Sequence, residues 1–207
     1  MLLATGAAWR RDGIGRSLRS PLPGLDTIPV YSPDDLMQGR LPQGRVLVFD
    51  DEHYYMAGVL AEQLARAGCT VHYATPEADA SSFTHNTLEQ GRIQTLLLQL
   101  GVHIHAHRVL CALESGRARC ACTYTGREEI LAVDAVVLVT ERVGEDRLYQ
   151  ELIADAAALA RAGIAQVRAI GDAHAPGIIA VAVYSGHLAA REIDGEASTM
   201  RRERVAL

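Results

Sequence analysis

The feature that most constrains the fold is a strand, a helix and a second strand that follow one another between residues 45 and 74. The apolar run Arg45–Asp50 (RVLVFD) predicts a buried strand. Met56–Ala67 places its apolar residues at helical spacing and ends at Gly68, a common helix stop. Cys69–Ala74 (CTVHYA) predicts the next strand. Such a unit closes most simply as a right-handed crossover between parallel strands, so we predict a Rossmann-like α/β domain.

Further segments predict that this domain has three layers, with a parallel sheet and an antiparallel β meander. Apolar residues at helical spacing predict a helix over Leu88–Leu100. The strand-like runs Ala118–Thr125 and Glu129–Leu131 flank turn residues and predict antiparallel pairing. Asp134–Thr140 (DAVVLVT) predicts another buried strand.

The two ends of the chain follow less regular patterns. Trp9–Pro29 is rich in Gly, Pro and Arg, which favours a linker or surface loop. We divide the chain into a first strand and linker over 1–44, the Rossmann-like domain over 45–142, a strand, turn and helix over 143–195, and a tail over 196–207. The other predicted elements are the end of a short buried strand followed by a tight turn over Leu2–Ala7, a short helix over Pro33–Gln38, an alanine-rich helix over Leu148–Ala162, a strand over Ala165–Ile170 and a helix over Ile178–Glu192.

The charge of the chain excludes some classes of partner. A formal net charge of -5 over 207 residues offers no basic field for nucleic acid or an anionic membrane. No apolar run reaches the roughly 18 residues that a membrane span needs. The first residues reach Arg10 and Arg11 too soon for a secretory signal, so we expect a cytoplasmic protein.

The turn after the first predicted strand lacks the glycines of a dinucleotide site. It runs from Asp50 to Met56 as DDEHYYM, with three acids in a row and two bulky tyrosines. Glycines normally let backbone N–H groups approach a pyrophosphate there, so this turn argues against NAD(P) binding. Two interpretations remain: the acids cap the helix, or Tyr54 and Tyr55 form a docking surface.

A second strand-to-helix turn is a better candidate for a nucleotide site. It contains Gly171 and Asp172 in the string GDAHAP. An aspartate at the end of a strand can accept hydrogen bonds from a ribose or ribityl hydroxyl, and a helix N-terminus favours a phosphate. The alternative is that Asp172 only caps the following helix.

Metal and catalytic sites have weaker support. His103, His105 and His107 alternate along the predicted strand Val102–Val109 and could in principle bind zinc or copper. We favour a polar stripe that faces solvent, because we see no nearby carboxylate to support a metal site. The spacing of the four cysteines does not match a zinc or iron–sulfur site, so we expect free thiols: Cys69, Cys111, Cys120 and Cys122. We predict no metal ligand and no catalytic residue in this chain.

Several strings resemble one family over nearly the whole chain. They are Ala4–Gly13 (ATGAAWRRDG), Val46–Gly68 with FDDEHYYM, Asn86–Gln94 with NTLEQ, and Gly171–Gly195 with GDAHAPG. Together they resemble the C-terminal part of trimethylamine dehydrogenase-like proteins, a group that includes histamine and dimethylamine dehydrogenases.

The resemblance implies a division of the fold and a set of cofactors. Val46 to about Thr140 would be an NADPH-type domain inserted into remnants of an FAD-type domain. The residues implied to line an ADP or FAD site are Ala4, Thr5, Gly6, Gly171 and Asp172. In this family FMN and a four-iron cluster belong to an N-terminal barrel, which this chain lacks.

The resemblance therefore implies a nucleotide-type domain or fragment of an amine dehydrogenase-like oxidoreductase that is not catalytic alone. Two alternatives stay open. In the first alternative, the chain is an independent ADP- or FAD-binding module. In the second, it is a structural or interaction domain that binds no nucleotide. Its expected partner is a flavoprotein subunit or a second copy of the chain.

Overall fold

A computed structural model describes residues 1–193. The predicted tail at 196–207 and the end of the segment predicted over 143–195 lie outside these residues. The contacts divide the chain into two compact units, Trp9–Glu141 and a second unit built from Met1–Ala8 together with the chain from Arg142 onward. Within residues 1–193, none of the helices combines the length and the apolar character needed to cross a membrane.

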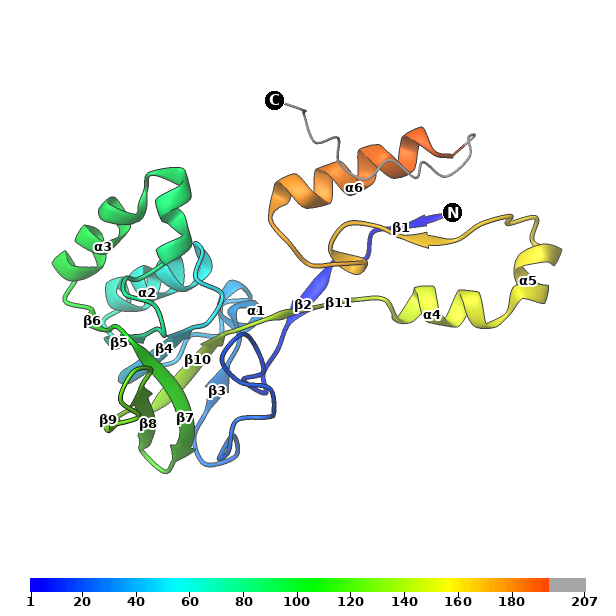
Figure 1. Cartoon of the computed structure of the whole chain (residues 1–207). Helices are drawn as coiled ribbons and strands as arrows, with labels where there is room; N and C mark the ends of the chain where they lie inside the picture. The colour runs from blue at the N-terminus through cyan, green and yellow to red at the C-terminus, as the bar shows by residue number, and fades with distance from the viewer. Residues whose placement is uncertain (194–207) are drawn as a thin grey trace. The chain divides into compact units, whose positions relative to one another are not determined.

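The larger unit is built on a five-stranded parallel sheet (Figure 1). Helix α2 (Met56–Arg66) connects β4 to β5, as the crossover pattern predicted. The apolar residues of β4, β5 and β10 are buried because the sheet is covered on both faces. The strands, in sheet order, are β3 (Val30–Tyr31), β10 (Ala135–Val139), β4 (Arg45–Asp50), β5 (Thr70–Ala74) and β6 (His103–His105).

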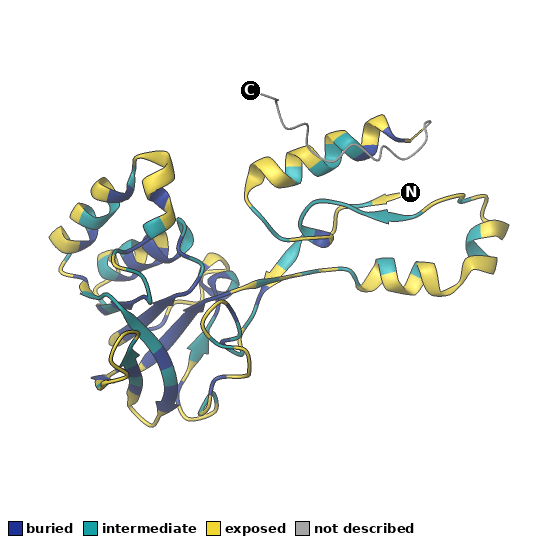
Figure 2. Cartoon of the chain, in the orientation of Figure 1, coloured by how far each residue is buried: buried dark blue, intermediate teal, exposed yellow. Residues whose placement is uncertain are grey.

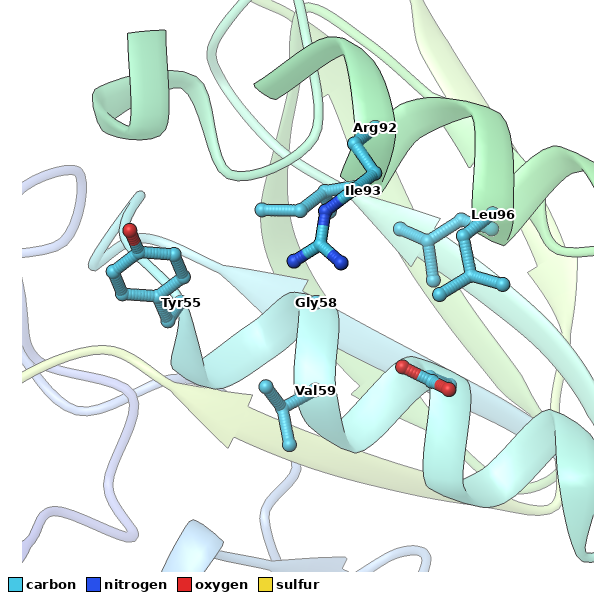
Figure 3. Close-up of a pocket in the computed structure, with 8 residues that line it drawn as sticks. Tyr55, Gly58, Val59, Arg92, Ile93 and Leu96 are labelled. Atoms are coloured by element: carbon cyan, nitrogen blue, oxygen red, sulfur yellow. The ribbon is translucent and has the colours of Figure 1, made fainter. Parts of the chain in front are cut away.

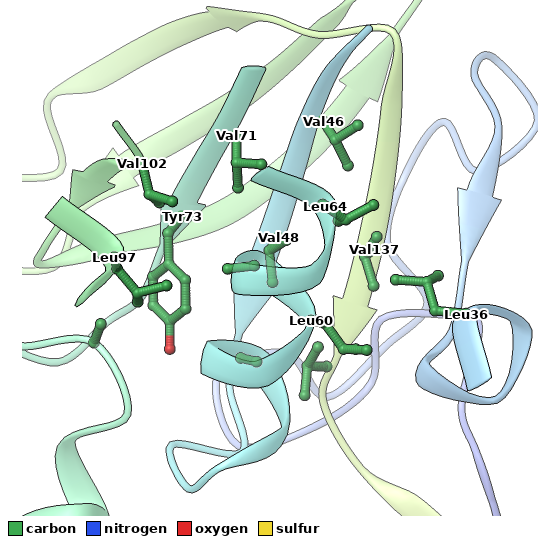
Figure 4. Packing of buried hydrophobic residues seen from close by; sticks show 14 of the residues in the cluster. Leu36, Val46, Val48, Leu60, Leu64, Val71, Tyr73, Leu97, Val102 and Val137 are labelled. Atoms are coloured by element: carbon green, nitrogen blue, oxygen red, sulfur yellow. The ribbon is translucent and has the colours of Figure 1, made fainter. Parts of the chain in front are cut away.

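Two different layers cover the sheet, which confirms the predicted three-layer α/β fold. Side chains alternate between its faces, so Val46 and Val48 face the helices while Leu47 and Phe49 face the other layer. Figure 4 shows the helical side, where Leu60 and Leu64 of α2 lie over the strands. The helices are α1 (Pro33–Met37), α2 and α3 (Gln90–Gln99), with the short 3-10 helix η1 (Ser82–Thr87) before α3; the other layer is the antiparallel meander β7 (Arg108–Glu114), β8 (Arg117–Cys122) and β9 (Glu128–Ala132).

The segment predicted as a linker or surface loop lies mostly at the surface and contributes a few side chains to the core. After β2 (Ala7–Trp9), it has the irregular backbone that its prolines and glycines predict. However, Leu22 and Ile28 are buried with the meander, and the N–H of Leu113 in β7 donates to the carbonyl of Pro23 at 2.9 Å. The backbone is thus a surface loop, as predicted, but two of its apolar side chains help to close one face of the sheet.

The smaller unit joins the two ends of the described chain. Strand β1 (Leu2–Leu3) pairs in parallel with β12 (Arg168–Ala169), and β11 (Arg142–Gly144) pairs with β2. β1 is partly exposed, with 36% of Leu2 accessible, so the prediction of a buried strand is wrong. The 3-10 helix η2 (Gly171–Ala173) precedes α6 (Ile179–Arg191).

The predicted alanine-rich helix is two helices, α4 (Arg147–Ala154) and α5 (Ala156–Arg161). Asp155 separates them because its carboxylate accepts a hydrogen bond from the N–H of Ala158 at 2.8 Å and so begins a new helix. Every residue of α4 and α5 is at least partly exposed (Figure 2).

Candidate functional site

The order of the parallel strands reverses between β4 and β10. The chain continues from β4 to β5 on one side, while β10 lies on the other. Open α/β sheets bind ligands outside the carboxyl ends of their strands at such a switch point. In this chain Asp50 ends β4, Asp51 follows it, and Thr140 follows β10.

The acids at this point are buried and hold the turn together. Asp50 accepts a hydrogen bond from the N–H of His53 at 2.8 Å and one from the hydroxyl of Tyr73. The same hydroxyl accepts the N–H of Ser81 at 3.0 Å. Burial raises the pKa of Asp50 to about 7, although the bonds from Tyr73 and His53 oppose this shift.

These contacts overturn the interpretation of the acids as helix caps. Tyr55 occupies the N-cap position of α2. His53 has a positive φ of 71°, and Asp50 and Asp51 are completely buried beneath the turn. Their carboxylates accept hydrogen bonds from side chains and N–H groups outside α2. These donors replace water in the buried surroundings of β4.

The chain's own segment Gly15–Ser17 fills the space at the switch point. Ser17 donates its N–H to Asp51 at 2.8 Å and its hydroxyl to the other carboxylate oxygen. A Cβ on Gly15 would lie 2.6 Å from an oxygen of Asp51 and 3.0 Å from the Cβ of Thr140. A dinucleotide pyrophosphate could approach this turn only if residues 15–17 moved away.

The two tyrosines of the turn differ in their surroundings. Tyr54 lies against Tyr55, with ring centroids 4.3 Å apart. The Tyr55 hydroxyl donates to Thr87 at 2.8 Å and also contacts the carboxylate of Glu89. The role of these tyrosines in docking stays a prediction.

A groove between α2 and α3 begins beside Tyr55 (Figure 3). It encloses about 240 Å³. Arg92 and Ile93 border it from α3, and Gly58 and Val59 border it from α2. The groove is mainly apolar, with Arg92 as a cationic group at its side.

In the smaller unit the structure brings together the residues predicted for an ADP or FAD site. Ala4, Thr5 and Gly6 follow β1, and Gly171 and Asp172 follow its parallel partner β12. The N–H of Ile170 donates to the carbonyl of Leu3 at 2.9 Å, so both turns leave the same edge. Gly6 and Gly171 have positive φ values of 84° and 59°, which favour glycine.

Arg142, which was not among the predicted site residues, forms an ion pair with Asp172. Arg142 of β11 donates from Nη1 to Asp172 at 2.7 Å and from Nη2 to the carbonyl of Gly177 at 2.6 Å. The N–H of Gly177 donates to the other oxygen of Asp172 at 3.1 Å. The N-cap of α6 is Ile178, so the alternative in which Asp172 caps that helix is wrong. Arg142 lies 30 residues from Asp172 in the sequence, and only the pairing of β11 with β2 could have indicated it.

The predicted histidine stripe is only partly present. β6 ends at His105, and His107 turns away with a φ of 54° to lie beside Tyr124. Instead of His107, His72 of β5 lies beside His105. The Nδ1 atom of His72 is 3.0 Å from the Nε2 atom of His105. Burial lowers the pKa of both rings, so they are neutral at pH 7.

The expectation that these histidines have no carboxylate nearby is wrong. The meander brings Glu129 to 3.4 Å from Nδ1 of His105. Within residues 1–193, no three His, Cys, Asp or Glu side chains are grouped so as to hold a metal ion.

The cysteines are free thiols, as predicted. They differ strongly in acidity. Burial raises the pKa of Cys120 to about 12. Hydrogen bonds from the side chain and backbone of Thr125 and from the N–H of Tyr124 lower the pKa of Cys122 to about 7.

Comparison with known proteins finds relatives that match all or nearly all of this chain. A family described as the OYE-like second alpha/beta domain matches residues 31–131. Dimethylamine dehydrogenase from Hyphomicrobium sp. (strain x) is 34% identical over 94% of this chain and 29% of that protein. The structure of histamine dehydrogenase from Rhizobium sp. 4-9 is 43% identical with a TM-score of 0.93, covering 100% of this chain and 33% of that chain.

A third relative is an amine oxidase. The structure of 6-hydroxypseudooxynicotine amine oxidase from Pseudomonas geniculata N1 is 41% identical with a TM-score of 0.87, over 93% of this chain and 29% of that chain. The fold and the family match define the class of the larger unit as an α/β domain of the OYE-like second type.

The chain belongs to the trimethylamine dehydrogenase-like family and corresponds to the C-terminal region of its members. The resemblance seen in the sequence is therefore confirmed. The chain spans about a third or less of the length of these relatives.

Proposed function

We propose that this chain supplies the nucleotide-type part of an amine-oxidising flavoprotein and does not oxidise amines alone. The observation that carries the proposal is the match of the whole chain to one third of histamine dehydrogenase, at 43% identity. In this proposal FMN and the four-iron cluster are held by the part of such enzymes that lies outside this chain, and they supply the electron transfer.

The surface of the smaller unit supports a role as one part of a larger protein. α4 and α6 expose apolar side chains that a separate domain would normally bury. They include Leu148 and Ile153 on α4 and Ile179, Val183 and Tyr184 on α6, with Ile179 83% accessible. The expected occupant of this surface is the rest of the FAD-type domain in a flavoprotein partner.

Coexpression with the N-terminal two thirds of the Rhizobium histamine dehydrogenase tests this role. We expect the two chains to copurify and to show amine-dependent dye reduction together. We expect this chain alone to show no such activity. Ile179→Asp should abolish copurification, whereas Arg127→Glu, a charge change on the larger unit, should leave it unchanged. Amine oxidation by this chain alone, or a strictly monomeric chain in the coexpression, would contradict the proposal.

The second candidate is adenine-nucleotide binding by the chain itself, at Ala4, Thr5, Gly6, Gly171 and Asp172. The local geometry supports it, because a Cβ on Gly6 would meet nothing within 4 Å and the Asp172 side chain is 24% accessible. A carboxylate oxygen that already accepts one bond can accept a second from a ribose hydroxyl. Arg142 places a positive charge beside the same carboxylate, where a phosphate would need one.

Titration calorimetry with ADP, FAD and NADH tests this candidate. We expect ADP or FAD to bind and Asp172→Asn to weaken binding. Arg142→Lys should also weaken it, because lysine cannot reproduce both hydrogen bonds of the guanidinium group. Arg147→Lys, on the exposed face of α4, is the matched control and should bind like the wild type. No heat with any of the three nucleotides would remove this candidate.

A further inference from the structure

Three histidines lie together at one edge of the parallel sheet. His72 of β5 pairs in register with His103 of β6, and His105 is two residues further along the same strand. Residues two apart on a strand share a face, so all three rings lie on one side of the sheet. The His72 centroid is 5.3 Å from that of His103 and 5.3 Å from that of His105. β6 is an edge strand and His103 is exposed, so this cluster is open to solvent.

The carboxylate of Glu129 orients one of these rings. Its Oε1 lies 3.4 Å from Nδ1 of His105, and its Oε2 accepts a hydrogen bond from Arg108 at 2.8 Å. A carboxylate beside Nδ1 favours the proton on that nitrogen and leaves the lone pair on Nε2. That lone pair faces Nδ1 of His72 at 3.0 Å.

We propose that Nε2 of His105 and Nδ1 of His72 are the two protein ligands of a divalent transition-metal ion of the zinc, nickel and copper class. Two nitrogens bound at about 2.0–2.1 Å to one ion lie about 2.9–3.4 Å apart for angles between square and tetrahedral. The 3.0 Å separation lies within this range. Water completes the coordination, because no third ligand converges on this point among residues 1–193.

The two imidazole rings carry the same net charge before and after the metal ion binds. The hydrogen bond between the rings places the mobile proton of His72 on Nδ1. When the ion binds, that proton leaves for solvent and Nε2 of His72 takes up another, so the ring stays neutral. The two nearest arginines are already paired with carboxylates, Arg45 with Asp134 and Arg108 with Glu129. Neutral imidazoles are good ligands for these metals.

Titration of the full chain with Cu²⁺ tests the proposal, because copper binds most tightly in this class and reports its ligands by electron paramagnetic resonance. We expect one high-affinity Cu²⁺ per chain, with hyperfine coupling to two nitrogens. His72→Ala and His105→Ala should each lower the affinity at least about tenfold and remove one nitrogen coupling. His187→Ala, which removes an exposed imidazole on α6, is the matched control and should bind like the wild type.

Glu129→Gln tests whether the carboxylate of Glu129 orients His105 for metal binding. It should weaken Cu²⁺ binding by about 10- to 100-fold while both nitrogen couplings remain. Circular dichroism checks that each variant is folded, and His105→Gln replaces His105→Ala if the alanine variant does not fold. The proposal is overturned if the wild type binds no Cu²⁺ at tens of micromolar, or if folded His72 and His105 variants bind Cu²⁺ as the wild type does. In that case the two rings form only an imidazole–imidazole hydrogen bond.

Discussion

Ser17 donates two hydrogen bonds to the carboxylate of Asp51, one from its N–H at 2.8 Å and one from its hydroxyl. Asp51 is completely buried at the switch point of the sheet, 34 residues away in the sequence. These bonds fix the irregular segment at residues 15–17 in the place where related folds bind a dinucleotide. Removing one of these bonds leaves part of a buried carboxylate without a donor.

We expect Ser17→Ala to lower the free energy of unfolding by about 1–3 kcal/mol. Gly15→Ala should also destabilise the larger unit, because its Cβ would lie 2.6 Å from Asp51. Trp9 is the single tryptophan and is almost buried, so its fluorescence during urea unfolding reports on this unit. Ser20→Ala, an exposed serine in the same segment, is the control. Equal stability of the Ser17 and Ser20 variants would show that the bonds to Asp51 do not hold the segment.

The stability of the larger unit should fall as the pH rises toward 7, because of Asp50. The folded pKa of about 7 lies above the unfolded value of 3.8, so the folded state keeps a proton that the unfolded state releases. This contribution is fully present below about pH 4 and is lost as the pH rises through about 7. Its size is on the order of a few kcal/mol. Urea unfolding of the wild type and Asp50→Asn at several pH values between 4 and 8 measures it.

The difference between wild type and Asp50→Asn should therefore change with pH between 4 and 7. Asp134 gives a control of opposite sign, because hydrogen bonds from Arg45 lower its pKa to about 2. Its contribution is present above about pH 4 and is lost only as the pH falls through about 2, so the difference between wild type and Asp134→Asn should stay constant between pH 4 and 8. A pH-independent difference for the Asp50 variant would mean that its carboxyl group is ionised throughout.

Gly24 should be intolerant of any side chain. Its φ is +86°, and an added Cβ would lie 1.9 Å from the carbonyl oxygen of Leu113. Gly116 also has a positive φ, +71°, but a Cβ there would meet nothing within 4 Å. We expect Gly24→Ala to prevent stable folding of the larger unit and Gly116→Ala to cost only about 1 kcal/mol. Similar urea midpoints for the two variants would contradict the packing of residues 22–24 against β7.

Cys122 should react with iodoacetamide before the other thiols at pH 7.5. Its pKa is about 7 because of the hydrogen bonds from Thr125 and Tyr124, whereas burial raises the pKa of Cys120 to about 12. Peptide mapping by mass spectrometry measures the order of labelling. Thr125→Val should slow the labelling of Cys122, while Thr123→Val should leave it unchanged. Faster labelling of Cys120 than of Cys122 would be the opposite result.

The central elements of the fold could be predicted because their patterns are local. The apolar runs of β4, β5 and β10 and the spacing within α2 indicate a parallel crossover unit, and all four are present. The break at Asp155 was missed because helical periodicity continues across it, and only the capping bond to Ala158 shows the boundary.

The candidate sites depend on long-range pairing, which periodicity does not reveal. Thr5 and Asp172 could be proposed from the family resemblance, but Arg142 could not, because only the fold brings β11 to that turn. The partnership of His72 with His105 follows from the register of β5 and β6. Likewise, Leu22 belongs to the core although its surroundings lack any regular pattern.

The larger unit begins and ends at neighbouring points, since the N–H of Arg10 donates to the carbonyl of Glu141 at 2.9 Å. A module with adjacent ends can be exchanged, deleted or replaced by a short connection without altering the path of its host chain. Homologues could thus carry a different insert between β2 and β11 while keeping the turns at Gly6 and Gly171 intact.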